Sequence, residues 1–421
     1  MFRTAVQPQT GKAAAGGRPA RAGRRRATDL SVSGLTYGAL IVFMGVAAVN
    51  TQANLLFAVL GVMVGVLLVA LVLSWVVLRR LEVRRTLPAH AVVGRPVTIS
   101  YAVKNNKRFW PALSINVTEL DADRVFTRRP QVYALHAAPG MSAVVPVTLT
   151  PRRRGLHTLD RHQVSTSFPF GFVRRAAMLH APATLLVFPA IGEVAPRVLA
   201  ALASAESTGR NVRPRRGGQD EFFGTREYRP GDPPRMIHWR RSATSMVARL
   251  PLVTKEMTHV SPPRLLIVVD NHAPADTDLP AAERTVAVAA SLADAALARQ
   301  LQAGVVAFAG DEAEDGIEVL PPNAGKRHRR DALSVLARLP RNRTHGRSAL
   351  VEAARRHAGR DVSVVLVTPH AEQPLHVPRD SQHGGPVVLS SGDDELVSFA
   401  PGIRFDRARR KPETVREPRH V

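Results

Sequence analysis

"RLLIVVD", residues 264–270, is an unbroken apolar run that ends in an acid. A strand buried on both faces of a parallel sheet has this composition, because neither face is turned to water. The next segment carries apolar residues at helical spacing. They are Val286, Ala290, Ala293, Leu297 and Leu301. Asp278 suits the N-cap of this helix, Pro280 suits its first turn, and Gly304 suits its C-terminal end. A strand followed by a helix is therefore predicted.

Strand-like and helix-like segments continue to alternate towards residue 400. "VVAFAG" (305–310), "DVSVVLVTP" (361–369) and "GPVVLS" (385–390) are predicted as further strands, "GIEVLPP" (316–322) as an antiparallel edge strand, and 329–339 and 348–358 as helices. This alternation predicts an α/β domain with a doubly wound, mostly parallel sheet over residues 263–400.

Asp270 follows the first of these strands, and ligands of open α/β sheets bind beyond the carboxyl ends of strands. An acid followed by hydroxyl residues at alternate positions would form an oxygen cage for Mg²⁺. Here those positions hold His272 and Pro274, and Pro369 stands where a second carboxylate would be needed. We therefore expect no cofactor, and regard Asp270 and Thr344 as the remnant of a Mg²⁺ site.

"EFFGTREYRPGDPPRMIHWRRSA", residues 221–243, combines carboxylates, arginines and two large aromatic residues. A turn is predicted at 229–232, because Pro230 presets φ and Gly231 tolerates a positive φ. "MIHW" (236–239) reads as extended chain. Guanidinium groups bind carboxylates in bidentate pairs and stack on aromatic rings. Carboxylates in such surroundings stay ionised, so we predict a charged platform and no catalytic residue. The sequence leaves open whether Trp239 is buried or a contact residue.

Residues 79–190 are predicted to form an antiparallel β-sandwich-like domain. Segments such as "RPVTISYAVKN" (95–105) and "SAVVPVTLTP" (142–151) alternate apolar and polar residues and are separated by turn residues. Phe168-Pro169-Phe170-Gly171 is expected to form a turn that buries both aromatic rings. Residues 191–262 lose this periodicity, and are predicted to be a linker with one helix followed by the 221–243 stretch.

No charged residue occurs from Ser31 to Leu78. Two apolar runs on either side of "NTQAN" (50–54) are long enough to cross a bilayer, with Tyr37 and Trp75 near their ends, so 31–78 is predicted to be a transmembrane hairpin. Arginines flank it on both sides, at Arg18, Arg21, Arg24, Arg25 and Arg26, and at Arg79, Arg80, Arg84 and Arg85. The positive-inside rule then predicts a multi-pass protein of the inner (plasma) membrane, with both termini and the bulk of the chain in the cytoplasm.

The net charge of +24 comes with basic tails, 1–30 and 401–421, which are predicted to be solvated or to face the membrane. Sequence-specific nucleic-acid binding is not expected from tails of this kind. The chain has no cysteine, which excludes disulfides and thiolate chemistry.

The 221–243 stretch resembles the signature of the bacterial family named domain of unknown function 58. The matching residues are Glu221, Phe222, Gly224, Arg226, Glu227, Tyr228, Gly231, Asp232, Arg235, Ile237, Trp239, Ser242 and Ala243. The upstream segment 152–172 and the two apolar runs also fit, so the resemblance extends over about residues 35–370. It implies an α/β domain similar to a von Willebrand factor type A domain, whose usual Asp-x-Ser-x-Ser metal motif is not kept here. It also implies a MoxR-type AAA+ ATPase as a partner, and no established reaction.

The first functional hypothesis is a membrane-tethered cytoplasmic interaction or adaptor protein that works with such an ATPase in the assembly or maturation of other proteins. Arg226, Glu227, Asp232 and Arg235 would act through charge-assisted hydrogen bonds. Two alternatives stay open. One is a metal-dependent envelope hydrolase that uses Asp270 and Glu227. The other is a binder of anionic lipid or nucleic acid that uses the arginine-rich tails.

Overall fold

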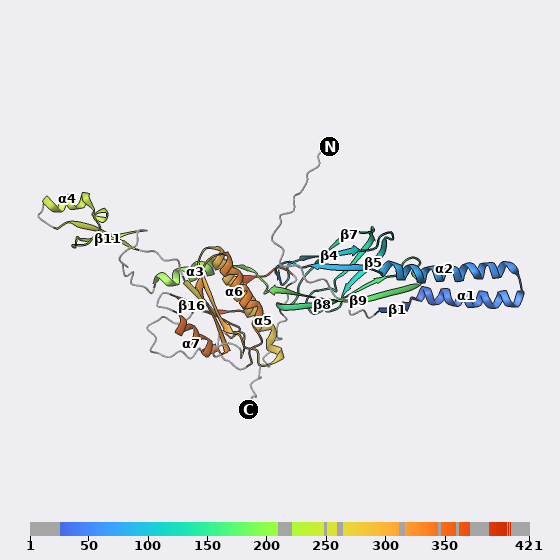
Figure 1. The fold of residues 1–421 in the computed structure, drawn as a ribbon. Helices are drawn as coiled ribbons and strands as arrows, with labels where there is room; N and C mark the ends of the chain where they lie inside the picture. Colours follow the sequence, from blue (N-terminus) through green and yellow to red (C-terminus); the bar gives the residue numbers. More distant parts are fainter. Residues whose placement is uncertain are drawn as a thin grey trace, which may run out of the picture. The chain divides into compact units, whose positions relative to one another are not determined.

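The computed structural model describes residues 26–208, 221–247, 251–258, 264–310, 316–343, 347–358, 362–370, 387–401, 403 and 405. The chain divides into two compact units, one formed chiefly by Met1–Ile191 and the other chiefly by Gly192–Leu333 and Leu339–Phe399. Each unit is described by itself, with the element labels of Figure 1.

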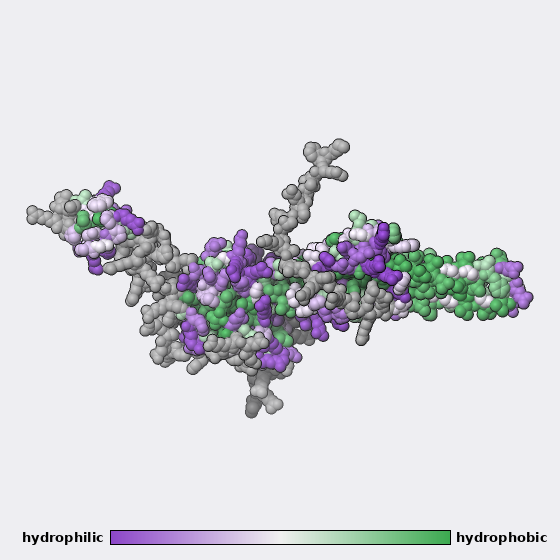
Figure 2. All heavy atoms as spheres, viewed as in Figure 1, coloured by the Kyte–Doolittle hydropathy of each residue, from purple (hydrophilic) through white to green (hydrophobic). Residues whose placement is uncertain are grey.

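The first unit contains two apolar helices, α1 (Val32–Thr51) and α2 (Asn54–Leu78). They have 20 and 25 residues, so both are long and apolar enough to cross a membrane, as predicted. Ser31 caps α1, because its Oγ accepts a hydrogen bond from the Gly34 backbone N–H at 3.0 Å. Figure 2 shows hydrophobic surface along both helices.

The rest of this unit is rich in strands, as expected, and contains two sheets. The larger sheet has the order β1 (Arg26–Leu30), β9 (Val173–Phe188), β8 (Gly155–Thr166), β5 (Ala112–Glu119) and β6 (Gln131–Ala137), with β3 (Ala91–Val92) parallel to β9. The smaller sheet has the order β2 (Leu81–Thr86), β4 (Val97–Asn105) and β7 (Ser142–Leu149). Buried residues of both sheets, among them Ile99, Val103, Ile115, Leu159 and Leu185, form one hydrophobic core. The two sheets therefore pack on each other around that core.

Two local predictions in this unit are wrong. Residues 26–30, assigned to the basic tail, form β1, because β9 leaves an edge free beside 173–177 where this strand pairs. Phe170 is 53% exposed, whereas both rings of the turn were expected to be buried. Phe168 packs against the core, and the chain turns back immediately after it through a Gly171 N–H to Ser167 carbonyl bond of 2.8 Å, which leaves Phe170 outside.

The second unit contains a five-stranded sheet. Its order is β15 (Ile317–Asn323), β14 (Gln302–Phe308), β13 (Arg264–Val269), β16 (Ser363–Thr368) and β17 (Val387–Ser390). Three of the pairs are parallel, and β14 with β15 is antiparallel. The sheet is thus mixed and mostly parallel, with the predicted antiparallel edge strand.

Helices cover the central strand β13 on both faces. Leu350 and Ala354 of α7 (Arg347–His357) pack with Leu266 and Val268 in one cluster. The alternate residues of β13 point to the other face and are also buried, and α5 (Leu279–Ala298) packs along β13, β14 and β16. This double burial explains why residues 264–269 carry no polar face.

The predicted helix signals around α5 are only partly right. Pro280 is in the first turn, but the Asp278 side chain does not cap the helix, and its carboxylate accepts from the Ala275 N–H at 3.1 Å. Gly304 does not stop the helix, which ends at Ala298; it lies inside β14. A Cβ at Gly304 would lie 2.5 Å from the Leu320 carbonyl oxygen, so the close approach of β15 requires a glycine there.

Part of the predicted linker belongs to this second unit. β10 (Glu193–Val194) pairs with β18 (Val397–Ser398), and α3 (Pro196–Thr208) packs against α5 and β16. The helix predicted in the linker is α3. Further along the chain, α6 (Lys326–Arg338) is close to the helix predicted at 329–339.

Candidate functional site

The 221–243 stretch forms most of a small antiparallel unit, here called the signature hairpin (residues 221–247 and 251–258). β11 (Glu221–Glu227) pairs with β12 (Val253–Thr258), and the register shifts between Phe222 and Gly224. The 3₁₀ turn η1 (Pro234–Met236) and helix α4 (Trp239–Val247) lie between the two strands in sequence.

An arginine–aspartate pair holds the turn of this hairpin. The Asp232 N–H donates to the Arg229 carbonyl at 3.0 Å and Gly231 has φ 102°, which is the predicted turn. Asp232 accepts two bonds from the Arg226 guanidinium, at 2.8 and 2.7 Å, and one from the Arg229 N–H at 3.0 Å. The side chains of Arg226 and Asp232 are 23% and 17% exposed. A bidentate pair with that degree of burial fixes the turn more firmly than a surface ion pair would.

A second set of contacts holds the start of α4 against β12. The Ser242 hydroxyl, which is buried, accepts from the Val253 N–H at 3.0 Å and donates to the Val253 carbonyl at 3.2 Å. Ile237 is also buried and forms a bridge with Thr254. The prediction of extended chain over 236–239 is therefore wrong except at Ile237. The Ser242 N–H bonds back to the His238 carbonyl at 2.9 Å and begins a helix.

Three further signature residues face outward. Trp239 is 63% exposed, and Glu227 and Arg235 are exposed as well, whereas Tyr228 is half-buried and its N–H donates to the Leu252 carbonyl at 2.7 Å. The position of Trp239 at the surface is thus fixed by the contacts of its neighbours Ile237 and Ser242 with β12. The side chains of Glu221 and Phe222 lie outside the described residues.

The strand-end site contains a hydrogen-bonded Asp–Thr pair. Asp270 directly follows β13, and Thr368 is the last residue of the neighbouring parallel strand β16. Between these two strands the order of strands in the sheet changes direction, which is where open α/β sheets bind ligands. The buried Thr368 hydroxyl donates to Asp270 Oδ2 at 2.7 Å, and the His272 N–H donates to Oδ1 at 3.2 Å. Thr344, the expected oxygen donor, lies outside the described residues. Over the described ranges no three histidine or carboxylate side chains are grouped as metal ligands.

Thr368 was missed at the sequence level, although it ends a strand that was predicted. Its hydroxyl already occupies one Asp270 oxygen, and a backbone N–H occupies the other. Asp270 is 2% exposed. In this arrangement the carboxylate joins two strand ends, which is a structural use of the residue.

A buried charged cluster in the β domain was also missed. Arg85 donates to Glu119 Oε1 at 2.5 Å and to two backbone carbonyls, and Tyr101 donates to the same Glu119 oxygen at 3.1 Å. The Arg85 and Glu119 side chains are 2% and 0% exposed. Burial raises the pKa of Glu119, although Arg85 opposes this effect. Burial, together with the charge of Arg85, lowers the pKa of His162 to about 4. These groups are shielded from solvent.

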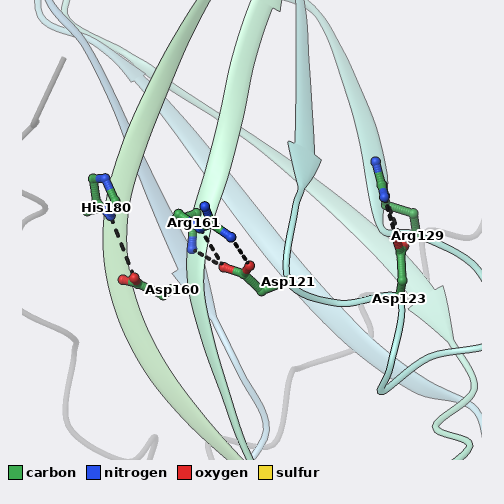
Figure 3. A network of polar contacts seen from close by, with 6 residues as sticks. All are labelled: Asp121, Asp123, Arg129, Asp160, Arg161 and His180. Carbon is green, nitrogen blue, oxygen red and sulfur yellow. Dashed lines mark hydrogen bonds and ion pairs between the residues drawn. The ribbon is translucent and has the colours of Figure 1, made fainter. Parts of the chain in front are cut away.

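Ion pairs on the surface of the same domain are drawn in Figure 3. Arg161 binds Asp121 through its side chain at 2.7 Å and through its backbone N–H at 2.9 Å, and this lowers the pKa of Asp121. His180 faces Asp160 at 3.6 Å. The pairs link the β5–β6 connection and strands β8 and β9, and their exposure limits each to a small contribution to stability.

The whole chain thus combines two membrane-length apolar helices, a strand-rich domain and an α/β unit with a signature hairpin. Residues 224–379 match the family model described as protein of unknown function DUF58. The recognition made from the signature residues is confirmed. A search among curated proteins finds no match.

Proposed function

We propose that this protein is a membrane-tethered adaptor, in which the signature hairpin presents Trp239 to a protein partner. The observation that carries the proposal is a large aromatic side chain, 63% exposed, on a scaffold held by the Arg226–Asp232 pair and by Ser242. Tryptophan and arginine are enriched among the residues that dominate binding energy. A scaffold ordered before binding also loses less conformational entropy when a partner docks.

The membrane side and the partner are parts of the same proposal. The arginines that flank α1 and α2 favour a hairpin in the inner membrane with the bulk of the chain in the cytoplasm. The proposed partner is a MoxR-type AAA+ ATPase, with which the adaptor assists the assembly or maturation of other proteins. The α/β unit is proposed to be von Willebrand factor type A-like and doubly wound, and its mostly parallel sheet with one antiparallel edge supports this.

The hydrolase alternative gains no support from the described residues, because Asp270 is engaged by Thr368 and by a backbone N–H. The alternative that uses the arginine-rich tails concerns chain outside the described residues. Neither is proposed.

Replacing Trp239 with serine is expected to weaken binding of the MoxR-type ATPase of the same organism about 30-fold, the loss typical of a hot-spot side chain. The full chain in lipid nanodiscs would be titrated with the purified ATPase, and Kd measured. Trp239→Ser should leave the thermal unfolding midpoint unchanged, because the side chain is exposed.

Tyr133→Ser is the matched control, since Tyr133 is 54% exposed but lies in the β domain, and it should bind as the parent does. Asp232→Ala should also weaken binding, because it removes the acceptor of three bonds that order the turn. Equal Kd values for the parent and Trp239→Ser would contradict the proposal.

A further inference from the structure

Two connections of the β domain meet the membrane-length helices at the end of this unit where the helices join it. The Lys107 ammonium group donates to the Val76 and Val77 carbonyls at 3.2 and 2.7 Å, at the last turn of α2. On the other helix, the Ser31 N–H donates to the Phe172 carbonyl at 3.1 Å, and the Tyr37 ring stacks on Phe172 with 4.2 Å between centroids. The β4–β5 and β8–β9 connections are therefore attached directly to α2 and α1.

The buried side chain of Asn105 orders the β4–β5 connection and the β6–β7 turn. Its Nδ2 donates to the Trp110 and Ala137 carbonyls at 2.9 and 3.0 Å, and its Oδ1 accepts from the Lys107 N–H at 3.2 Å. Its backbone N–H donates to the Met141 carbonyl at 2.9 Å, which ties the β6–β7 turn to the same place. One buried amide thus fixes residues 107–110 and the 138–141 turn beside the end of α2.

The β8–β9 connection approaches α1 without space between the two backbones. A Cβ on Gly34 would lie 2.0 Å from the Phe172 carbonyl oxygen, so only glycine fits at this contact. Phe170, two residues earlier, is therefore held at the level of the first turns of α1. Its position along the helix axis is fixed by the same contact.

Large apolar side chains project from these two connections and from the β6–β7 turn. Phe109, Trp110, Met141 and Phe170 are 75%, 57%, 65% and 53% exposed. Arginines accompany them: the Arg79 guanidinium lies 4.4 Å from the Trp75 ring centroid and that of Arg108 lies 5.1 Å from the Phe109 ring centroid. Exposed aromatic rings beside arginines are typical of side chains at the headgroup level of a bilayer.

We propose that these side chains form a lipid-binding collar (Phe109, Trp110, Met141 and Phe170, with Arg79 and Arg108) that inserts into the interfacial region of the phospholipid bilayer. The rings and Met141 lie among the headgroups, and the two guanidinium groups bind lipid phosphates. This inference rests on the proposed membrane span of α1 and α2, and continues it onto the β domain. The collar holds the β domain down on the bilayer surface, in addition to the covalent link through α2.

Site-directed spin labelling tests the collar in the full chain, because the sequence contains no cysteine to remove. Phe109→Cys and Phe170→Cys would each be labelled with a nitroxide in nanodiscs of phosphatidylcholine and phosphatidylglycerol. Accessibility to oxygen, which concentrates in lipid, would be compared with accessibility to a water-soluble nickel chelate. The ratio of oxygen accessibility to nickel-chelate accessibility is expected to be several-fold higher at both labels than at a label on Leu156→Cys. Leu156 is 56% exposed, at the other end of β8, whose 12 residues extend about 40 Å.

A label at Val62→Cys in α2 separates failure of the collar from failure of the span. If position 62 favours oxygen while positions 109 and 170 behave like position 156, the collar is wrong and the membrane span stands. If position 62 favours the nickel chelate, both proposals are wrong. Arg108→Gln should move the label at 170 towards water in the mixed-lipid nanodiscs, and no such movement would overturn the phosphate contact of Arg108.

Discussion

Replacing Arg85 with methionine is expected to lower the free energy of unfolding of the β domain by about 3–5 kcal/mol. The change leaves the Glu119 carboxylate, which is 0% exposed, without its positive partner. It also removes the donor of two 2.8 Å bonds to the Leu159 and Ala181 carbonyls. An uncompensated charge in a buried position costs far more than the pair contributes when both partners are present.

Denaturant unfolding of the full chain in detergent, with hydrogen exchange of the backbone around Leu159 as a local probe, would measure this effect. Arg84→Met is the control, since its partner is Glu82 and the two side chains are 63% and 26% exposed. It should cost no more than about 1 kcal/mol. The double change Arg85→Met with Glu119→Leu should recover much of the loss. Equal losses of unfolding free energy in Arg85→Met and in the control Arg84→Met would show that the buried pair has no special role.

Acidification is expected to destabilise the β domain through His162, by about 3 kcal/mol in total. Burial lowers the pKa of His162 from 6.5 to about 4, and the side chain is fully buried. Between these two pH values the unfolded chain binds a proton at this residue and the native chain does not. The stability due to the neutral imidazole is therefore complete above pH 6.5 and is lost as the pH falls towards about 4.

The unfolding free energy of the parent and of His162→Gln, measured across this pH window, tests the prediction. The variant should lose less stability on acidification than the parent does. Glu119, whose pKa is raised by burial, contributes with the opposite sign in both proteins, so their difference isolates His162. If the unfolding free energy of the parent and of His162→Gln changed equally with pH, His162 would be excluded as the titrating group.

Features set by local sequence could be predicted. The apolar runs of α1 and α2, the buried strand β13 and the turn at 229–232 each depend on residues close together in the chain. The pair Arg226–Asp232 spans six positions, and the sequence pointed to arginine–carboxylate pairs in this stretch. Short-range periodicity and turn chemistry are sufficient for features of this kind.

Features set by tertiary pairing could not be predicted. From the sequence, Arg85 was interpreted only as one of the positive charges that flank α2. Nothing nearby in the sequence identifies Glu119 as its partner. Thr368 and Asp270 meet only when two strands far apart in the chain become neighbours. The exposure of Trp239 depends on Ser242 and β12 rather than on the tryptophan itself. In each case the fold of distant segments decides the surroundings of the residue.

The proposed arrangement, a cytoplasmic platform anchored by a helical hairpin, is tested most directly by cysteine labelling in spheroplasts. Single cysteines would replace Thr51, at the tip of the helical hairpin, and the exposed Arg235 in the signature hairpin, in a chain with no other cysteine. A membrane-impermeant maleimide is expected to label position 51 in intact spheroplasts and position 235 only after permeabilisation. Labelling of position 235 in intact spheroplasts would contradict the arrangement.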